Sequence, residues 1–254
     1  MDLKLKGRHF LVTGGTRGIG RAIAMTFAEE GADVSICARD AKAVDETLVV
    51  LRAKGVSAFG RALDVADGEP LAGFVEDAAK ARGRLDGLVA NASALSGGSE
   101  PNEFQKAFEV DLMHTRNAAE AAIPYLAKNE SGSIVAISSI SGSEDYGYGS
   151  VSYGTMKAAL FFYVKSLARH VASKGIRANV VSPGTTYFKD GYWDEVKRND
   201  SERFARTIAE NPLGRMATPE EIANVVVFLS SPVASLVSGA NVVVDSTITI
   251  RIPN

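Results

Sequence analysis

Short apolar segments alternate with helix-like segments from one end of the 254-residue chain to the other. The apolar segments do not alternate with polar residues, which is typical of strands buried on both faces of a parallel sheet. Strands separated by helices form right-handed crossover units. The pattern therefore predicts an α/β fold, a doubly wound parallel sheet of about seven strands with helices on both faces. The strands are expected at 8–14, 33–38, 57–63, 85–92, 132–139, 176–182 and 240–245, and the helices at 18–30, 41–54, 69–82, 101–128, 151–173 and 219–229.

One segment interrupts this alternation. Residues 184–211 are charged and rich in aromatic side chains. A long insertion after a sheet strand is often functional, so we expect a substrate lid at about 185–211. A pair of surface helices whose aromatic side chains pack on the body is the alternative. The chain has no internal repeat, no low-complexity linker and no shift in composition, so a single domain over residues 1–254 is expected.

Composition argues against several classes of partner. The formal net charge is −2 and there is no basic run, so nothing in the sequence indicates binding to nucleic acid or to an anionic membrane. No apolar stretch reaches about 18 residues and the N-terminus lacks a signal-peptide pattern, so we expect no membrane span and a cytoplasmic location. The sequence predicts no metal site, because it has a single cysteine, Cys37, and its histidines, His9, His114 and His170, are far apart. All four are expected at ordinary strand or helix positions.

A glycine-rich turn, VTGGTRGIGRAIA at 12–24, follows the first expected strand and opens the first helix. Its spacing, with Gly14, Gly18 and Gly20, provides a tight turn, a close approach of the backbone to a pyrophosphate, and close packing of helix on strand. The helix N-terminus adds free N–H groups and a partial positive charge. No G-K-[S/T] follows, which excludes a P-loop. A dinucleotide site is therefore predicted, with a glycine-rich turn that binds no ligand as the alternative.

The end of the second expected strand distinguishes between the two nicotinamide dinucleotides. An acidic residue there would bind the ribose 2′-hydroxyl of NAD(H). The strand instead ends ICARD, with Ala38 at that position and Arg39 after it. An arginine can pair with a 2′-phosphate, and Arg17 in the glycine turn offers a second cation. Asp40 comes later, where the N-cap of the next helix suits it better. We therefore expect NADP(H) rather than NAD(H).

Further motifs, taken with this turn, resemble the short-chain dehydrogenase/reductase family. The matching pieces are TGGTRGIG at 13–20, Asp64 after the third strand, VANAS at 89–93, ISS at 137–139, YGTMK at 153–157 and SPGTT at 182–186. They extend over nearly the whole chain, and the glycine turn combined with Tyr-x-x-x-Lys and an upstream serine is specific. The resemblance implies a Rossmann-type fold, an enzyme similar to 3-oxoacyl-acyl-carrier-protein reductases, and a homotetramer or homodimer joined through the helices at 101–128 and 151–173.

The resemblance also implies that Tyr153 is the general acid/base. Lys157 lies one helical turn later on the same face, so its ammonium can lower the phenol pKa from about 10. In reduction, Tyr153 protonates the carbonyl oxygen as hydride reaches the carbon, and Ser139 hydrogen-bonds the same oxygen. Ser138 and Ser141 stay open as alternatives to Ser139, because the loop before Tyr153 is longer than is usual in the family. No metal is implied.

The remaining cofactor contacts follow from the resemblance by position. They are Gly14, Thr16, Arg17, Gly18, Ile19 and Gly20 in the glycine turn, Arg39, Asp64 and Val65 around the adenosine, Asn91 and Ala92 beside its ribose, and Tyr153, Lys157, Pro183, Gly184 and Thr186 around the nicotinamide.

Three positions depart from the family's pattern. Asp111 replaces an asparagine of the proton relay near the lysine, and is expected to raise the pKa of Lys157 and to alter activity without abolishing it. Ser93 replaces a glycine and is expected to cost backbone freedom. Residues 245–247 read DST instead of DGG, in a region that commonly forms a subunit interface.

The leading hypothesis is an NADP(H)-dependent oxidoreductase that reduces a ketone to a secondary alcohol, or runs the reverse reaction. A non-catalytic NADP(H)-binding sensor and an NAD-dependent alcohol dehydrogenase are the alternatives. Ser139, Tyr153 and Lys157 are all present, which favours the enzyme. The aromatic residues of the expected lid favour a small-molecule substrate with an apolar or aromatic part.

Overall fold

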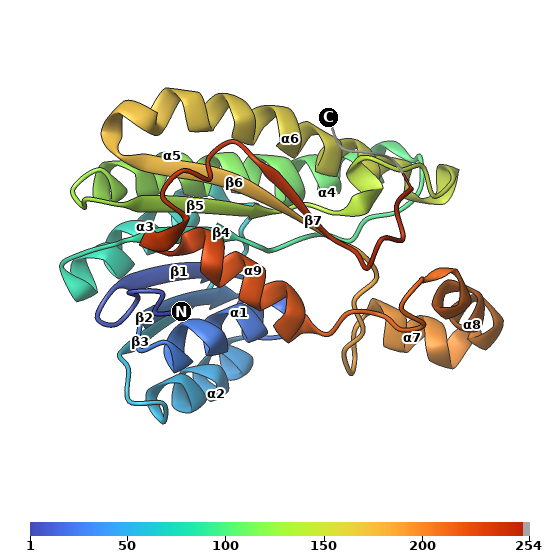
Figure 1. Ribbon diagram of the computed structural model, residues 1–254, viewed down its shortest axis with the longest axis horizontal. Coiled ribbons are helices and arrows are strands. Elements are labelled where there is room, and N and C mark those ends of the chain that lie inside the picture. The colour runs from blue at the N-terminus through green and yellow to red at the C-terminus, as the bar shows by residue number, and fades with distance from the viewer. Residues whose placement is uncertain (251–254) are drawn as a thin grey trace.

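All seven strands of the sheet run parallel, in the order β3-β2-β1-β4-β5-β6-β7 (Figure 1). The computed structural model describes residues 1–250. The strands are β1 (His9–Thr13), β2 (Asp33–Ala38), β3 (Ala58–Ala62), β4 (Gly87–Ala90), β5 (Gly132–Ile137), β6 (Ile176–Pro183) and β7 (Asn241–Val244). The predicted doubly wound sheet is confirmed, with strand ends shifted by at most a few residues.

The winding direction of the sheet reverses between β1 and β4. From β1 the chain adds β2 and β3 on one side, and from β4 it adds β5, β6 and β7 on the other. β1 and β4 are themselves paired, with Leu11 opposite Leu88. In open parallel sheets, ligands bind at the carboxyl ends of the strands beside such a reversal. The fold therefore directs the search for a site to the ends of β1, β4 and β5.

Helices cover both faces of the sheet (Figure 1). One face packs against α1 (Gly18–Glu29), α2 (Ala41–Arg52) and α9 (Pro219–Ser230), and the other against α3 (Gly68–Arg82), α5 (His114–Leu126) and α6 (Val151–Val171). Each face has its own apolar core, and in the first the rings of Phe10 and Phe27 stack with centroids 4.2 Å apart. Because both faces are covered, β1, β4, β5 and β6 are buried throughout, which explains their continuous apolar sequences.

Local signals in the sequence set several helix ends. Asp40 caps α2 by accepting a hydrogen bond from the Ala43 amide, as expected for this residue. Thr218 and Glu221 form a reciprocal capping box at the start of α9. Gly83 ends α3 with φ +67°, a left-handed conformation that favours glycine.

The helix expected at 101–128 contains an irregular segment that the sequence did not predict. It consists of α4 (Pro101–Ala107), a π-helix η1 (Phe108–Met113) and α5, which ends at Leu126. π-helical turns are rare and are frequent at functional sites, because they reorient a side chain inside a continuous helix. Here the segment contains Asp111, which is buried.

The segment at 184–211 forms two short helices beside the main body (Figure 1). They are α7 (Tyr192–Asn199) and α8 (Ser201–Glu210). Within residues 1–250, every helix is too short or too polar to cross a bilayer.

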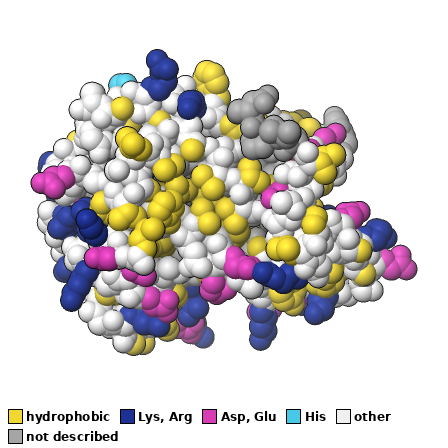
Figure 2. Space-filling model, in the orientation of Figure 1, with side chains coloured by type: hydrophobic (Ala, Val, Ile, Leu, Met, Phe, Trp, Pro, Cys, Tyr) yellow, Lys and Arg dark blue, Asp and Glu magenta, His cyan; other side chains and the backbone are white. Residues whose placement is uncertain are grey.

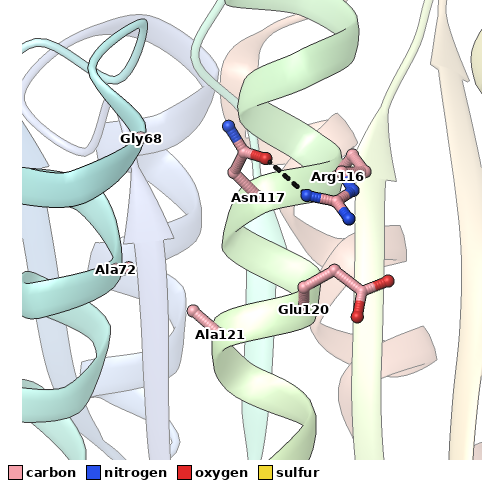
Figure 3. Close-up of a pocket in the computed structure, with 6 residues that line it drawn as sticks. All are labelled: Gly68, Ala72, Arg116, Asn117, Glu120 and Ala121. Carbon is pink, nitrogen blue, oxygen red and sulfur yellow. Dashed lines mark hydrogen bonds between the residues drawn. The ribbon is translucent and has the colours of Figure 1, made fainter.

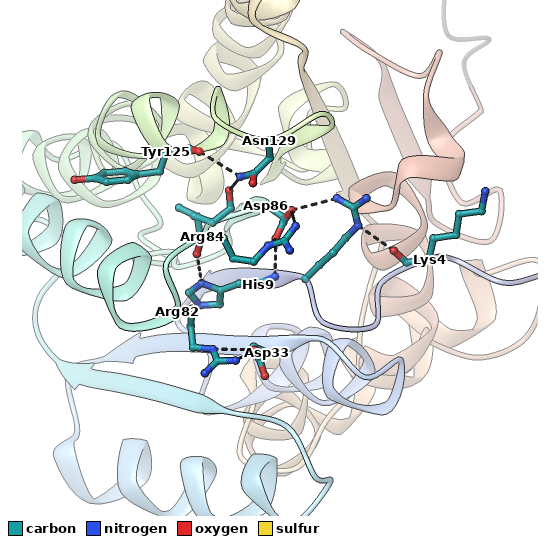
Figure 4. A network of polar contacts seen from close by, with 10 residues as sticks. Lys4, His9, Asp33, Arg82, Arg84, Asp86, Tyr125 and Asn129 are labelled. Carbon is teal, nitrogen blue, oxygen red and sulfur yellow. Dashed lines mark hydrogen bonds and ion pairs between the residues drawn. The ribbon is translucent and has the colours of Figure 1, made fainter.

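A polar network ties together the amino-terminal edge of the sheet (Figure 4). The buried Asp86 carboxylate accepts hydrogen bonds from the His9 amide and from the side chains of Arg8 and Arg84. The His9 ring bridges the Arg84 carbonyl oxygen and the Ser35 hydroxyl. His9 and the buried Cys37 thus occupy structural strand positions, as expected. This network lies at the edge of the sheet opposite the carboxyl ends of the strands.

Candidate active site

The glycine turn after β1 needs glycine at each of its three motif positions. Gly14 has φ +66° and Gly18 has φ +51°, both in the left-handed region that other residues rarely adopt. At Gly20 a Cβ atom would collide with the Gly14 carbonyl oxygen and with the Asn91 side chain. The helix can therefore approach the turn closely only because residue 20 has no side chain.

The N-terminus of α1, directly after this turn, has no side-chain cap. Arg17 occupies the N-cap position with an extended backbone, and its side chain makes no capping hydrogen bond. Uncapped N–H groups and the helix dipole together favour a phosphate at such a position. Thr16 and Ile19 lie half-buried on either side of Gly18. The backbone of the turn thus fits a dinucleotide pyrophosphate in its chemistry.

The end of β2 presents cations, and the acidic residue that follows it in the sequence caps a helix. Arg17 and Arg39 are both exposed, and neither side chain has a hydrogen-bond or ion-pair partner among residues 1–250. Asp40, the one acidic residue nearby in the sequence, is occupied with the N-cap of α2. Such an arrangement is suited to a 2′-phosphate and poorly suited to a ribose 2′-hydroxyl.

The segment after β3 lies beside the end of β2. The Leu63 amide donates to the Ala38 carbonyl oxygen at 2.9 Å, which holds the two together. Asp64 is exposed and accepts a hydrogen bond from the Ala66 amide, while Val65 is buried. Asp64 and Val65 are therefore within the same neighbourhood as Ala38, where the sequence placed the adenosine.

A buried hydrogen-bond chain beneath the turn includes a residue that the sequence did not identify. The Thr13 hydroxyl oxygen accepts from the amides of Asn91 and Ala92 at 2.9 and 3.2 Å. His114 Nε2 lies 2.9 Å from the same hydroxyl, and its Nδ1 lies 2.9 Å from the Val110 carbonyl oxygen. Burial lowers the pKa of His114 to about 4, so its ring is neutral at pH 7 and donates from Nδ1. No motif marks His114 in the sequence, and only the fold brings it to the glycine turn.

Tyr153 and Lys157 meet at the carboxyl end of β5. The Lys157 ammonium nitrogen lies 5.4 Å from the centre of the Tyr153 ring and donates to the Ile137 carbonyl oxygen at 2.9 Å. It also lies 3.0 Å from a carboxylate oxygen of Asp111, and both members of this ion pair are buried. The Ser139 side chain hydrogen-bonds Tyr153. Four residues from three separate segments thus converge on one point.

Electrostatics in this cluster act in opposite directions on the phenol. Burial raises the pKa of Tyr153, Lys157 opposes that rise, Asp111 adds to it, and the hydrogen bond from Ser139 lowers it. The net pKa of Tyr153 is above its ordinary value. For Lys157, burial alone would lower the pKa, but the carboxylate of Asp111 and the phenol of Tyr153 raise it above the ordinary value. The expected rise in the pKa of Lys157 therefore agrees with the structure, and the ammonium stays charged at neutral pH.

Ser138 and Ser139 differ in what their hydroxyls contact, and Ser141 takes part through its backbone amide. Ser138 donates to the carbonyl oxygen of Lys157 at 2.8 Å and is buried, so its hydroxyl is already occupied. Ser139 contacts Tyr153, and its hydroxyl oxygen also accepts from the Ser141 amide at 3.1 Å. The hydroxyls of Ser138 and Ser139 thus have different partners, although both residues lie just beyond the end of β5 at Ile137.

The segment after β6 continues the site. Pro183 is the last residue of β6, and a Cβ atom at Gly184 would lie 2.8 Å from the Asp245 Cα atom, so glycine is required there. The Thr186 hydroxyl donates to the Gly184 carbonyl oxygen at 3.2 Å. Within residues 1–250 the buried Thr185 hydroxyl has no hydrogen-bond partner. Thr185 is therefore a further candidate contact for a bound group, which the sequence did not single out.

Two of the departures from the family pattern differ in their backbone conformation. Ser93 does not adopt the left-handed region, and its hydroxyl oxygen accepts from the Leu95 amide, so the expected backbone cost is wrong. Leu95 instead has φ +51°. After β7 the chain reads DST where the family has DGG. Ser246 and Thr247, which replace the two glycines, both have φ +60°, a conformation that favours glycine.

Two hollows lie away from the Tyr153 cluster. One of about 300 Å³ separates α3 from α5 (Figure 3) and is lined by Gly68, Ala72, Arg116, Asn117, Glu120 and Ala121. The other, of about 340 Å³, is lined by Tyr187, Lys197, Phe204, Ile208, Gly214, Arg215, Met216, Ala217 and Thr218. Neither contains a residue of the Tyr153 cluster.

Tyr146, in the loop before Tyr153, is half exposed, and the side chain of Tyr148 lies outside the part of the chain that the structure describes.

Comparison with known proteins is consistent over nearly the whole chain. The family model described as Enoyl-(Acyl carrier protein) reductase matches residues 14–249. Isoepoxydon dehydrogenase of Penicillium expansum is 39% identical over 247 residues, which cover 96% of this chain and 95% of that protein.

Solved structures show the same similarity in three dimensions. L-sorbose reductase from Gluconobacter frateurii, in complex with NADPH and L-sorbose, superposes with a TM-score of 0.92 at 30% identity, covering 99% of this chain and 100% of that one. A 7α-hydroxysteroid dehydrogenase in complex with NADH and a 7-oxo bile acid superposes with a TM-score of 0.90 at 28% identity, covering 97% and 96%. Similar proteins thus bind either dinucleotide and substrates of different size.

Proposed function

The chain belongs to the short-chain dehydrogenase/reductase family of oxidoreductases, and we propose that it is an NADP(H)-dependent enzyme that interconverts a ketone and a secondary alcohol. One observation carries the proposal. The buried pair of Asp111 and Lys157 holds a charged ammonium beside the phenol of Tyr153, and Ser139 hydrogen-bonds that phenol. A phenol with a fixed cation and a hydroxyl partner is equipped to move a proton.

Each residue of the cluster has a separate task in this proposal. When bound, the nicotinamide supplies hydride for reduction or accepts it in oxidation. Tyr153 donates its phenolic proton to the carbonyl oxygen in reduction and removes the hydroxyl proton in oxidation. Ser139 hydrogen-bonds the same substrate oxygen and holds it next to Tyr153. Lys157 stabilises the phenolate form of Tyr153 through its positive charge.

The choice of NADP(H) rests on Arg17 and Arg39. Their guanidinium groups are exposed and lack partners among the described residues, while the Asp40 carboxylate is occupied by its own helix. A 2′-phosphate would give these two cations a counter-ion. Since L-sorbose reductase binds NADPH and the hydroxysteroid dehydrogenase binds NADH, the preference depends on this chain's own residues.

The segment at 185–211 is proposed to cover the substrate. It follows β6 directly and carries aromatic rings that contact one another, including Tyr187 with Phe204 and Tyr192 with Trp193. A small molecule with an apolar or aromatic part suits such a lid. A cytoplasmic location is proposed with it, consistent with the absence of a spanning helix from residues 1–250.

A homotetramer or homodimer is proposed from exposed apolar surface. On α6 the Phe162 side chain is 79% exposed, so this helix presents a large apolar side chain at the surface. An apolar patch lies over the region of β7 and α9 in Figure 2. Val242, Val243 and Val244 of β7, the edge strand of the sheet, are half-buried. Two such faces are sufficient for closed symmetric assembly through two kinds of contact.

Titration with NADPH and NADH tests the proposed function. We expect the unaltered protein to bind NADPH more tightly, and Arg39→Asp to lose about tenfold or more of that preference, because charged hydrogen bonds to a phosphate contribute about 1.5–3 kcal/mol. Lys42→Asp is the matched control, since this exposed residue on α2 undergoes the same charge change. A ketone panel follows, with Tyr153→Phe as the inactive reference. Preference for NADH in the unaltered protein would contradict the role given to Arg39, and binding without turnover would favour a non-catalytic sensor.

A further inference from the structure

The ring of Phe188 fills the space that glycine leaves open in the phosphate-binding turn. A Cβ atom built on Gly18 would lie 2.5 Å from the Cζ atom of Phe188 and 2.8 Å from its Cε1 atom. A Cβ atom built on Gly191 would lie 2.7 Å from the same ring. The ring is therefore enclosed between two glycines that are far apart in the sequence. A side chain at either glycine position would collide with the ring.

That space is the one a dinucleotide needs. In turns of this type, the middle glycine has no side chain so that the pyrophosphate can approach the backbone closely. Gly18 is this middle glycine, and it is also the first residue of α1, where the uncapped N–H groups would receive the phosphate. An apolar ring and a pyrophosphate cannot occupy one volume.

Polar contacts hold the segment that carries this ring. The Tyr187 amide donates to the Ala217 carbonyl oxygen at 2.9 Å. Beyond the ring, Asp194 on α7 accepts from the Tyr187 hydroxyl at 2.7 Å and from the Asp190 amide at 3.0 Å. Asp190 has φ +60°, which lies in the left-handed region that residues other than glycine rarely adopt. The ring thus belongs to a defined turn tied to α7, and displacing it must disturb α7.

We propose that Phe188 is a determinant of dinucleotide affinity: its ring covers the phosphate site of the free protein, and binding requires the ring and the start of α7 to move away. The proposal rests on the proposed function, since it concerns the same dinucleotide site. The measured affinity then includes the free energy of uncovering Gly18, so that the apparent Kd equals the intrinsic Kd divided by the fraction of uncovered protein.

Substitution of the ring gives a signed prediction. Phe188→Ala removes the competitor and leaves Gly18, Arg17 and Arg39 in place. The Kd for NADP⁺, measured by isothermal titration calorimetry, is expected to fall about fivefold or more, which corresponds to at most about one-fifth of the unaltered free protein being uncovered. Phe204→Ala is the matched control, because it removes another aromatic ring of the same segment, one that contacts Tyr187 instead of the glycine turn.

The single tryptophan provides an independent readout. Trp193 lies on α7 next to Tyr192, and its emission reports changes around the start of that helix. Saturating NADP⁺ is expected to change Trp193 emission in the unaltered protein, and to change it less in Phe188→Ala, where no ring needs to be displaced.

The outcomes separate this proposal from the proposed function. A lower Kd for Phe188→Ala alone supports the inference. An unchanged or higher Kd for Phe188→Ala, or an equal gain for Phe204→Ala, overturns it while leaving the dinucleotide site in place. Failure of both the unaltered protein and the variant to bind NADP⁺ or NADPH overturns the proposed function itself.

Discussion

Replacing Asp111 with asparagine should move the pH dependence of catalysis toward lower pH. The substitution keeps the size of the side chain and removes its charge. Asp111 lies 3.0 Å from the Lys157 nitrogen, and that nitrogen lies 5.4 Å from the centre of the Tyr153 ring, so the carboxylate is at most 8.4 Å from the ring centre. At an effective dielectric constant of about 20, a unit charge at about 8 Å contributes roughly 2 kcal/mol, or about 1.5 pH units.

The sign follows from the pKa of Tyr153. Burial is the main cause of its raised pKa, and the Asp111 carboxylate adds to the rise. Alcohol oxidation needs the phenolate, so its rate increases as the pH rises through the pKa of Tyr153. Without the carboxylate this pKa falls, and the increase in rate occurs at lower pH. Ketone reduction needs the neutral phenol, so its decline at high pH shifts in the same direction.

The assay is kcat/KM for oxidation and reduction between pH 6 and pH 10, with the unaltered protein and Asp111→Asn compared in the same buffers. We expect both profiles to shift down by about 1 to 1.5 units. Asp77→Asn is the control, because this carboxylate pairs with Arg61 outside the cluster. Superimposable profiles in a folded, active variant would refute a charge effect of Asp111 on Tyr153. A shift to higher pH would show that Lys157 loses its proton without Asp111, which would refute the sign of the argument.

Two further predictions concern backbone packing and a buried cation. Gly20→Ala places a Cβ atom against the Gly14 carbonyl oxygen, so it should lower the free energy of unfolding by about 1–3 kcal/mol and weaken NADPH binding. Urea denaturation measures the first effect and titration with NADPH the second. Gly73→Ala is the control and should cause neither effect, because nothing lies within 4 Å of its Cβ position. Arg177 is buried and donates to the Leu229 carbonyl oxygen at 2.7 Å near the end of α9. Arg177→Met should therefore lower the free energy of unfolding, measured by urea denaturation, by about 2–4 kcal/mol and leave kcat nearly unchanged. Equal stability of the two proteins would contradict this.

The sequence was sufficient for features that depend on local signals. Continuous apolar strands separated by helices predicted the parallel sheet, because a strand covered on both faces has no polar side. Asp40 was correctly assigned to a helix N-cap because it directly precedes a helical pattern. The requirements at Gly14, Gly18 and Gly20 were predictable for the same reason, since they arise within one short turn.

The sequence was insufficient where a role depends on packing between distant segments. His114 has no motif around it, and becomes part of the site only because α5 packs beside the end of β1. The π-helical turn at Asp111 has no residue signature, yet it brings the carboxylate to Lys157. For the same reason the roles of Ser139, Tyr153 and Lys157 stay predictions from the family's pattern, which the geometry supports and kinetics must test.

Glycine motifs illustrate the limit most clearly, because a missing side chain specifies a space and not its occupant. The spacing of the turn predicts that something approaches Gly18 closely, and dinucleotide chemistry supplies one occupant. In the free protein the structure supplies another, the ring of Phe188, which comes from far along the chain. The affinity for the dinucleotide then depends on its own binding free energy and on the free energy needed to displace the Phe188 ring from the same space. A sequence motif describes only one of them, so the motif alone should overestimate how readily this chain binds its cofactor.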